Sequence, residues 1–291
     1  MKKFIIIDGN AYVYRSYYAI PALFSYDRQQ VNAVYGFMKF LFKIINKFRP
    51  DYMAVCFDHP SETFRKKIFK DYKKNRKPID ESLKNQMLIS KKAVNILNIK
   101  MIEKQGYEAD DLIATLAKIG RKNHLQIIIV TGDKDIFQLI DCTNIFIWND
   151  SKNIICDENW IKIRYQNIEP NKLVDVFSIM GDSSDNIRGI NGIGEKTALK
   201  FVKKFGSIEN ILSEKYDISP KFCNLFQQYK DIILLNKKII KLDDCVKINY
   251  NIDDFDINNF KIGKINNSEI INFFTELGFK SLINKYFEFV N

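Results

Sequence analysis

Three carboxylates lie within four residues, at the start of a segment with helical spacing. Glu108, Asp110 and Asp111 come directly before or within the first turn that leads into the apolar residues 112–117. The unpaired N–H groups and the positive dipole end of a helix start favour acidic residues, although one acid would satisfy that preference. Three like charges this close cost energy unless a cation neutralises them. The cluster therefore indicates either a helix cap or a metal site.

Three short apolar runs, at residues 4–7, 52–57 and 127–130, each end in acidic residues. The acids that follow them are Asp8, Asp58 and the pair Asp133 and Asp135. Helical patterns at 33–48 and 83–97 lie between the runs, which predicts a parallel sheet covered by helices on both faces. Ligands bind such sheets beyond the carboxyl ends of the strands. Each aspartate alone could be a cap or turn residue, but three strands ending alike favour an acidic site.

A change of pattern near Glu169-Pro170 marks a plausible domain boundary, because the residue before proline is pushed out of helical conformation. The chain beyond it is predicted to form helices joined by short turns. Asp182 and Asp185 add two acids at the spacing of a turn. Residues 189–198 then form a glycine hairpin opening onto a helix, whose free N–H groups can bind a phosphate. A single Gly-x-Gly is weak evidence, since most are simply turns.

A strongly basic segment lies between the second apolar run and the following helix. Residues 65–77 contain eight basic side chains and one acid, whereas the whole chain has a net charge of +10. Such a run can be a solvated loop or a lysine-rich helix face. Here Phe64, Phe69 and Tyr72 are interleaved with the charges, which is typical of a surface that pairs with phosphates and stacks on bases. The segment favours a nucleic-acid partner.

The composition restricts the kind of metal and the compartment. The chain has 291 residues, 46% of them hydrophobic and 27% charged, which is ordinary for a globular protein. No run approaches the roughly 18 uninterrupted apolar residues of a membrane span. Five widely spaced cysteines fit reduced thiols, and two histidines without a C-x-x-C pair make zinc improbable. We therefore expect a cytoplasmic protein whose metals are held by oxygen.

All the acids singled out so far are carboxylates at predicted strand ends, at one helix start or in one turn. Such ligands suit hard cations such as magnesium or manganese. Two such ions about 3.5 to 4 Å apart can activate water and stabilise the leaving oxygen of a phosphate ester. Beside a basic, aromatic segment, this chemistry indicates phosphodiester hydrolysis. The nine acids are Asp8, Asp58, Glu108, Asp110, Asp111, Asp133, Asp135, Asp182 and Asp185.

The ordered motifs resemble the 5′ nuclease domain of bacterial DNA polymerase I, in the flap endonuclease superfamily. The resemblance extends over essentially the whole chain, and its motifs are specific in combination rather than singly. They are Asp8-Gly9-Asn10, residues 55–58, Phe64-Arg65, Tyr72-Lys73, Arg76, residues 106–111, 131–135, 181–186, 192–197 and 277–282.

Pattern and resemblance together predict the fold. We expect an α/β protein with a mostly parallel central sheet flanked by helices and a C-terminal helical region. The nuclease core is expected at residues 1–170, with a basic arch inserted at about 61–90. The helical DNA-binding region is expected at 171–291, with a helix-hairpin-helix at about 186–203.

The resemblance implies a structure-selective nuclease that removes 5′ flaps, and RNA primers at junctions, by exo- and endonucleolytic cuts in DNA replication and repair. It implies that the nine acids bind two Mg²⁺ or Mn²⁺ ions. Lys73 and Arg76 match arch residues that approach the scissile phosphate, while Arg65 and Tyr72 guide the 5′ strand, and Arg65 is grouped with the catalytic residues. The hairpin is implied to grip duplex phosphates, in some relatives with a potassium ion.

The partners implied by the resemblance are flapped or nicked duplex DNA, RNA–DNA junctions and a separate DNA polymerase, with the protein itself a monomer. Arg188 departs from the family pattern, because many bacterial relatives have proline there. A stand-alone nuclease and an excised domain both remain open. The residues expected to bind DNA are Arg15, Tyr72, Arg188, Gly192, Gly194, Lys196 and Thr197.

Three other functions fit parts of the same pattern. An aspartyl-phosphate phosphohydrolase could use Asp8 as nucleophile, but it normally has a second acid two residues later, where this chain has Asn10. A junction-binding protein without activity would leave the complete carboxylate set unexplained. A ribonuclease with a similar acidic sheet is the nearest alternative, although such domains are usually much shorter and lack the glycine hairpin.

Overall fold

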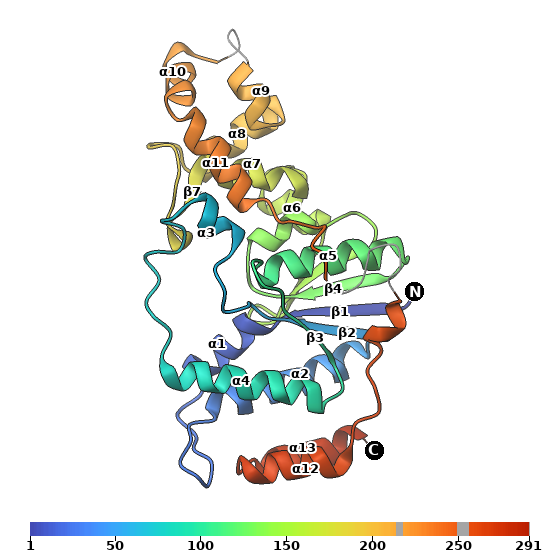
Figure 1. Cartoon of the computed structure of the whole chain (residues 1–291). Coiled ribbons are helices and arrows are strands. Elements are labelled where there is room, and N and C mark those ends of the chain that lie inside the picture. Colours follow the sequence, from blue (N-terminus) through green and yellow to red (C-terminus); the bar gives the residue numbers. More distant parts are fainter. Residues whose placement is uncertain (214–217, 249–255, 291) are drawn as a thin grey trace. The chain divides into compact units, whose positions relative to one another are not determined.

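The computed structural model describes residues 1–213, 218–248 and 256–290, with side chains described up to 287 (Figure 1). The chain forms two compact units, each built from separate stretches of sequence. Unit 1 comprises Met1–Pro60, Pro78–Gly132 and Asp244–Asn291, and unit 2 comprises Ser61–Lys77 and Asp133–Asp243. The sequence-based division at residue 170 stays a prediction. In the described part of the chain, no helix is long and apolar enough to cross a membrane.

Four parallel strands form the sheet of unit 1. They are β1 (Lys3–Asp8), β2 (Tyr52–Cys56), β3 (Lys100–Ile102) and β4 (Gln126–Val130), in the order β3-β2-β1-β4. Ile6 of β1 pairs with Ala54 on one side and Ile129 on the other. These strands are apolar on both faces because helices cover both faces of a parallel sheet. Their carboxyl ends therefore meet at one edge of the sheet.

The helices of unit 1 form a layer on each face of the sheet. Figure 1 shows α5 on one face and α1, α2 and α4 on the other, with α12 and α13 beyond α2. Phe42 of α2 packs edge-on against Phe274 at 6.2 Å between ring centroids, and Tyr286 lies 6.3 Å from it. The bounds are α1 Gly9–Ala19, α2 Asn32–Phe48, α4 Glu81–Ile96, α5 Ala109–Lys122, η4 Ile257–Phe260, α12 Asn267–Glu276 and α13 Lys280–Val290.

Unit 2 is mainly helical, with two short antiparallel strand pairs, β5 with β6 and β7 with β8. Together with unit 1 it confirms the predicted α/β class, with a mostly parallel sheet and a helical C-terminal region. Its elements are α3 Phe64–Ile68, η1 Asp135–Leu139, β5 Ile145–Asn149, β6 Ile154–Cys156, α6 Glu158–Arg164, η2 Pro170–Lys172, α7 Leu173–Met180, β7 Gly181–Asp182, η3 Ser183–Asp185, β8 Ile187–Arg188, α8 Glu195–Phe205, α9 Ile208–Ser213, α10 Pro220–Gln228 and α11 Lys230–Ile240.

Buried polar contacts fix the helices that carry the acidic turn of unit 2. The amide of Asn236 on α11 is buried and donates to the carbonyl oxygens of Ser178 and Arg188, both at 2.9 Å. Lys237 lies 2.6 Å from the Asp175 carboxylate on α7. Because a buried polar group costs free energy when it lacks a partner, these bonds hold α7, α11 and β8 in one arrangement.

Candidate metal and nucleic-acid site

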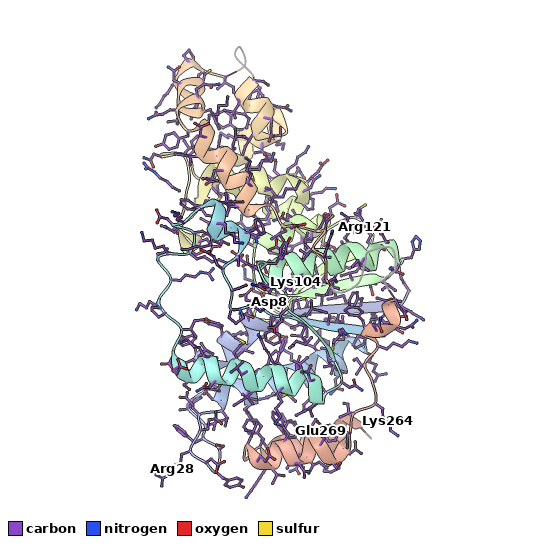
Figure 2. All side chains as sticks on the ribbon, in the orientation of Figure 1. Asp8, Arg28, Lys104, Arg121, Lys264 and Glu269 are labelled. Atoms are coloured by element: carbon purple, nitrogen blue, oxygen red, sulfur yellow. The ribbon has the colours of Figure 1, made fainter. Side chains whose placement is uncertain are left out.

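Asp8 connects three elements at the carboxyl edge of the unit 1 sheet. It ends β1 and caps α1, where its Oδ1 accepts a hydrogen bond of 3.0 Å from the Ala11 N–H. Its Oδ2 accepts from the Thr131 hydroxyl, just beyond β4, at 3.1 Å. Figure 2 labels Asp8 at this end of the strand. Asp8 is therefore both a helix cap and a fixed carboxylate at the predicted ligand-binding edge.

Asp58, directly after β2, is exposed and held by hydrogen bonds to the starts of two helices. Its Oδ1 accepts from the Ala109 N–H at the start of α5, at 2.7 Å. Asn10, near the start of α1, donates to its Oδ2 at 2.9 Å, and the Asp58 N–H donates to the Asn10 Oδ1 at 3.0 Å. Asn10 thus stands where a phosphohydrolase would have its second acid, and here it orients a neighbouring carboxylate.

The acidic cluster at the start of α5 contains a capping box. Glu108 is the N-cap and its side chain accepts from the Asp111 N–H, while the Asp111 Oδ2 accepts from the Glu108 N–H at 3.2 Å. Asp111 is completely buried and Asp110 is half-buried. Two of the acids, Glu108 and Asp111, therefore do cap the helix, as one interpretation of the sequence predicted. Capping does not explain why a third acid lies beside them.

Cys56, fully buried at the end of β2, responds to this concentration of charge. Burial first, and then the charges of Asp8, Asp110 and Asp58, raise the pKa of its thiol well above the ordinary value. The three carboxylates come from the ends of β1 and β2 and from the start of α5. Folding of unit 1 therefore brings together acids that are far apart in the sequence, and Asp58 alone bonds to partners 48 and 51 residues away.

The acids of unit 2 lie on or beside two short 3₁₀ helices. Asp135 begins η1, and the Asp133 Oδ1 accepts from its N–H at 2.8 Å. The Asp135 Oδ1 is buried and has no hydrogen-bond partner among the described residues. Burial first, and then the charge of Asp133, raise the pKa of Asp135 to about 7 against the opposing effect of Lys134. A buried carboxylate oxygen without a donor is a suitable ligand for a cation.

Asp182 caps η3 and is paired with a lysine. Its Oδ1 accepts from the Ser184 N–H at 2.8 Å and from the Ser184 hydroxyl at 2.6 Å, and the Lys134 Nζ lies 2.8 Å from its Oδ2. Partial burial acts to raise the pKa of Asp182, but the hydrogen bonds from Lys134 and Ser184 outweigh it and lower the pKa below its ordinary value. The same contacts that lower this pKa fix the orientation of the Asp182 carboxylate.

Asp185, at the end of η3, contacts the basic segment that the sequence singled out. Arg76 Nη2 lies 2.5 Å from its Oδ1, and the Tyr72 hydroxyl donates to its Oδ2 at 3.2 Å. The Lys73 Nζ lies 3.8 Å from the same oxygen. Three side chains of the predicted arch thus converge on one predicted metal ligand.

Arg65 lies inside unit 2 rather than on its surface. Only 1% of the residue is exposed, its Nε donates to the Ile239 carbonyl at 2.7 Å, and its Nη2 donates to the Lys241 carbonyl at 3.4 Å. Its guanidinium stacks 4.5 Å from the centre of the Phe64 ring. In this arrangement Arg65 anchors α3 to the C-terminal end of α11, where carbonyl groups attract a cation.

The glycine hairpin presents an open surface at the start of α8. Gly192 has a φ of +81°, which favours glycine, and Gly194 is the extended N-cap residue of α8. A Cβ built on either glycine would meet nothing within 4 Å. Lys196 is exposed and Thr197 is half-buried in the first turn of the helix. The hairpin follows β8 and leads into α8, and its predicted helix-hairpin-helix role stays a prediction.

Two further arginines were predicted to bind DNA. Arg15 is exposed on α1 in unit 1, and Arg188 is exposed on β8 in unit 2. The Arg188 guanidinium lies 6.0 Å from the centre of the Tyr229 ring. Both side chains therefore have access to solvent, as a phosphate contact requires.

The predicted metal ligands are all carboxylate oxygens, but within each unit they are not clustered tightly around one point. Among the described residues of each unit, no three of the nine predicted carboxylates have oxygens that all lie within 4.8 Å of one another. The donors nevertheless fit a hard divalent cation, because all are carboxylates and one buried oxygen lacks a donor.

Two family models, both of nuclease domains, together match most of the chain. The family model of the 5′-3′ exonuclease N-terminal, resolvase-like domain matches residues 3–166, and that of the 5′-3′ exonuclease C-terminal SAM fold matches residues 168–262. The chain belongs to the 5′-3′ exonuclease family.

Individual relatives agree with this assignment. A 5′-3′ exonuclease of Aquifex aeolicus is 35% identical over 285 residues, covering 98% of this chain and 95% of that protein. DNA polymerase I of Bacillus subtilis is 34% identical over 291 residues, covering 98% of this chain and 32% of that protein. The chain thus spans nearly all of the first relative and about a third of the second.

Solved structures share the fold at low sequence identity. The bacteriophage T5 D15 flap endonuclease, in a complex with DNA and metal ions, superposes with a TM-score of 0.70 at 17% identity, covering 83% of this chain and 90% of that one. The catalytic core of Rad2 in complex with a DNA substrate gives a TM-score of 0.63 at 15% identity, covering 99% and 91%.

Proposed function

We propose that this chain is a divalent-metal-dependent nuclease that hydrolyses phosphodiester bonds near the 5′ ends of DNA strands, including 5′ flaps and primer RNA at junctions, in replication and repair. The observation that carries the proposal is the convergence of acids at the carboxyl edge of the unit 1 sheet, where Asp8 caps α1 and Asp58 bonds to Asn10 of α1 and to the Ala109 N–H at the acidic start of α5. The Aquifex relative, which matches 98% of this chain, is named a 5′-3′ exonuclease.

The two acidic groups supply ligands of one chemical kind. In unit 1 the metal ligands are Asp8, Asp58, Glu108, Asp110 and Asp111, and in unit 2 they are Asp133, Asp135, Asp182 and Asp185. Mg²⁺ or Mn²⁺ bound by such ligands supplies Lewis acidity and lowers the pKa of water in a two-metal hydrolysis. The protein's own part is to orient the ligands, as Asn10 does for Asp58 and Ser184 for Asp182.

Lys73 and Arg76 are proposed to stabilise the negative charge that develops on the scissile phosphate. Both are cations beside Asp185, so they lie next to a proposed metal ligand. If they act in the transition state, Lys73→Ala lowers the single-turnover rate by more than it weakens DNA binding. Weaker DNA binding with an unchanged saturated rate would show that these cations attract DNA but do not act in the transition state. Lys172→Ala, in a surface pair with Glu169, is the matched control.

The exposed hairpin is proposed to bind the phosphates of duplex DNA. Gly192 and Gly194 leave the start of α8 open, with Lys196 and Thr197 beside it. A potassium ion bound by the hairpin would add a further positive charge there. Arg15 and Arg188 are proposed as additional phosphate contacts, and Tyr72 as a guide for the 5′ strand through its place beside Lys73.

The substrates proposed are flapped or nicked duplex DNA and RNA–DNA junctions. A DNA polymerase is the proposed functional partner, because several relatives are DNA polymerase I proteins of which this chain matches about a third. We propose that the protein acts as a cytoplasmic monomer. Its net charge of +10 favours a polyanionic partner such as DNA.

One assay tests the proposal directly. A 5′-flap duplex labelled on the flap is incubated with the protein in Mg²⁺ or in excess chelator. We expect cleavage near the junction only with Mg²⁺. Binding without cleavage in Mg²⁺ and in Mn²⁺ would indicate a junction-binding protein instead, and hydrolysis of an aryl phosphate ester without DNA cleavage would indicate a phosphohydrolase.

A further inference from the structure

Within unit 2, the basic segment 71–76 is joined to the acidic turn 183–186 by three rungs of hydrogen bonds. The Lys73 N–H donates to the Asp185 carbonyl at 2.9 Å. On one side of this bond the Asn75 amide donates to the Ser183 carbonyl at 2.7 Å, and on the other side the Asn186 amide donates to the Asp71 carbonyl at 2.7 Å. The two segments thus run antiparallel, with one asparagine contributed by each.

The central rung holds an unusual backbone conformation. Lys73 has a φ of +56°, in the left-handed region that a lysine rarely adopts. Such a conformation persists when the surrounding structure over-determines it, and it is common at functional sites. Here the residues two positions before and two positions after Lys73 are both fixed by asparagine amides. These two bonds restrict the backbone on either side of Lys73, whose Nζ lies 3.8 Å from the Asp185 carboxylate.

We propose that Asn75 and Asn186 are positioning residues, a reciprocal amide clamp that holds Lys73 in the orientation needed at the scissile phosphate. This inference rests on the proposed role of Lys73. Neither asparagine needs to touch DNA or metal for it. The clamp acts by fixing the backbone on both sides of Lys73, so its loss misplaces a cation without removing it.

The location of the clamp favours a positioning role over a stabilising one. Asn75 is exposed and Asn186 is half-buried, and hydrogen bonds at such sites add little to stability. The buried contacts of the same region, from Tyr72 to Asp185 and from Arg65 to Ile239, hold the segment to unit 2 independently. The amides therefore determine where Lys73 points rather than whether the segment is folded.

The substitutions Asn75→Ala and Asn186→Gly test the clamp. Glycine at 186 keeps the left-handed backbone, since Asn186 has a φ of +58°, and removes only the amide donor. The matched control is Asn210→Ala, which removes an exposed asparagine amide that donates to the Phe205 carbonyl at 2.7 Å elsewhere in unit 2. Single-turnover rates are measured on a 5′-flap duplex in Mg²⁺, and binding is measured in Ca²⁺.

We expect each clamp variant to lower the saturated single-turnover rate by about tenfold or more and to change the DNA dissociation constant by less than about threefold. Asn210→Ala should leave both quantities unchanged. In a Lys73→Ala background, Asn186→Gly should lower the rate by less than about twofold further, because the clamp acts through Lys73.

The outcomes separate failure of the clamp from failure of the proposed function. Wild-type rates for both asparagine variants, with Lys73→Ala impaired, would overturn the clamp alone. Independent, multiplying effects of Asn186→Gly and Lys73→Ala would also overturn it, since a positioning role requires coupling. Absence of cleavage by the wild-type protein would overturn the proposed function itself.

Discussion

Carboxylates in both units accept hydrogen bonds from the backbone and are also proposed to bind metal. Substitution of aspartate by asparagine keeps the first role and weakens the second, so it tests the two roles separately. Asp111→Asn keeps an oxygen that can accept from the Glu108 N–H, and Asp133→Asn keeps one for the Asp135 N–H. Each change removes a negative ligand. We therefore expect folded proteins whose flap cleavage in Mg²⁺ is lower by about 100-fold or more.

Circular dichroism and a flap-cleavage assay check this prediction together. Asp157→Asn is the control, because Asp157 accepts from the Trp160 N–H at 2.7 Å as the cap of α6 and lies outside the acidic set. Cleavage within about twofold of wild type for both Asp111→Asn and Asp133→Asn would rule out the assigned role of these acids.

The raised pKa of Asp135 predicts a pH-dependent stability in the presence of chelator. The folded protein holds this proton up to about pH 7, whereas the unfolded chain releases it near the ordinary pKa of 3.8. Stability due to this group therefore falls as pH rises from 3.8 to about 7 and stays low above. Asp135→Asn should raise the melting temperature most above pH 7 and very little below pH 4. A constant difference across that range would contradict the assignment.

Residue spacing could predict the acids but not the partners of the basic segment. Asp8 and Asp58 follow strands whose carboxyl ends must meet in a parallel sheet, so their proximity follows from the pattern. Arg65 bonds to a carbonyl 174 residues away, and Tyr72 bonds to a carboxylate 113 residues away. No local pattern contains that information, which explains why the sequence, whose resemblance implied that Arg65 guides the 5′ strand, gave no sign that its side chain is buried.

The glycine hairpin provides a test at the level of one element. Gly194 has an extended backbone, and a Cβ there meets nothing, so Gly194→Val covers the open surface without straining the turn. We expect weaker binding to flapped duplexes and a flatter salt dependence, by about one unit of slope for each phosphate that the hairpin no longer reaches. Cleavage of a short single strand should change much less.

The ratio of flap cleavage to single-strand cleavage across a salt series measures this effect, with circular dichroism confirming that the variant is folded. Gly192→Val is a useful contrast, because its φ of +81° makes a side chain costly to the turn itself. An unchanged ratio for Gly194→Val would mean that the hairpin is an ordinary turn.

Elements with a strong period could be predicted, and short ones could not. The apolar runs at 4–7, 52–57 and 127–130 correspond to β1, β2 and β4, and the helical patterns correspond to α2 and α4. The strand β3 was missed, because its three residues include a lysine and are only partly buried. The five-residue helix α3 lies within a run of basic residues and has no apolar periodicity that could predict it. Its buried residue is Arg65.

At the scale of the molecule, removal of the C-terminal segment should destabilise unit 1. Residues 244–291 supply Phe260 against Phe4 and supply Phe274 and Tyr286 against Phe42. All three added aromatic residues are fully buried. A chain ending at residue 243 should therefore lose about 6 kcal/mol or more of stability, since a buried Phe alone is worth about 3–5.

Chemical denaturation of the two chains measures this change in stability, and the single substitution Phe287→Ala is the control, because Phe287 is an exposed residue of the same segment. Equal unfolding midpoints for the truncated and full-length chains would show that unit 1 is complete without its last segment.

Unit 1 contains residues on both sides of unit 2 in the sequence, and Asp244–Asn291 follow all of unit 2. On the ribosome, the strands of its sheet are all made before unit 2 is complete, while Phe42 must wait for Phe274 and Tyr286. Until then α2 presents an apolar surface that other nascent chains or a chaperone can bind. The segment after residue 243 therefore decides how long the newly synthesised chain exposes this surface and is prone to aggregate.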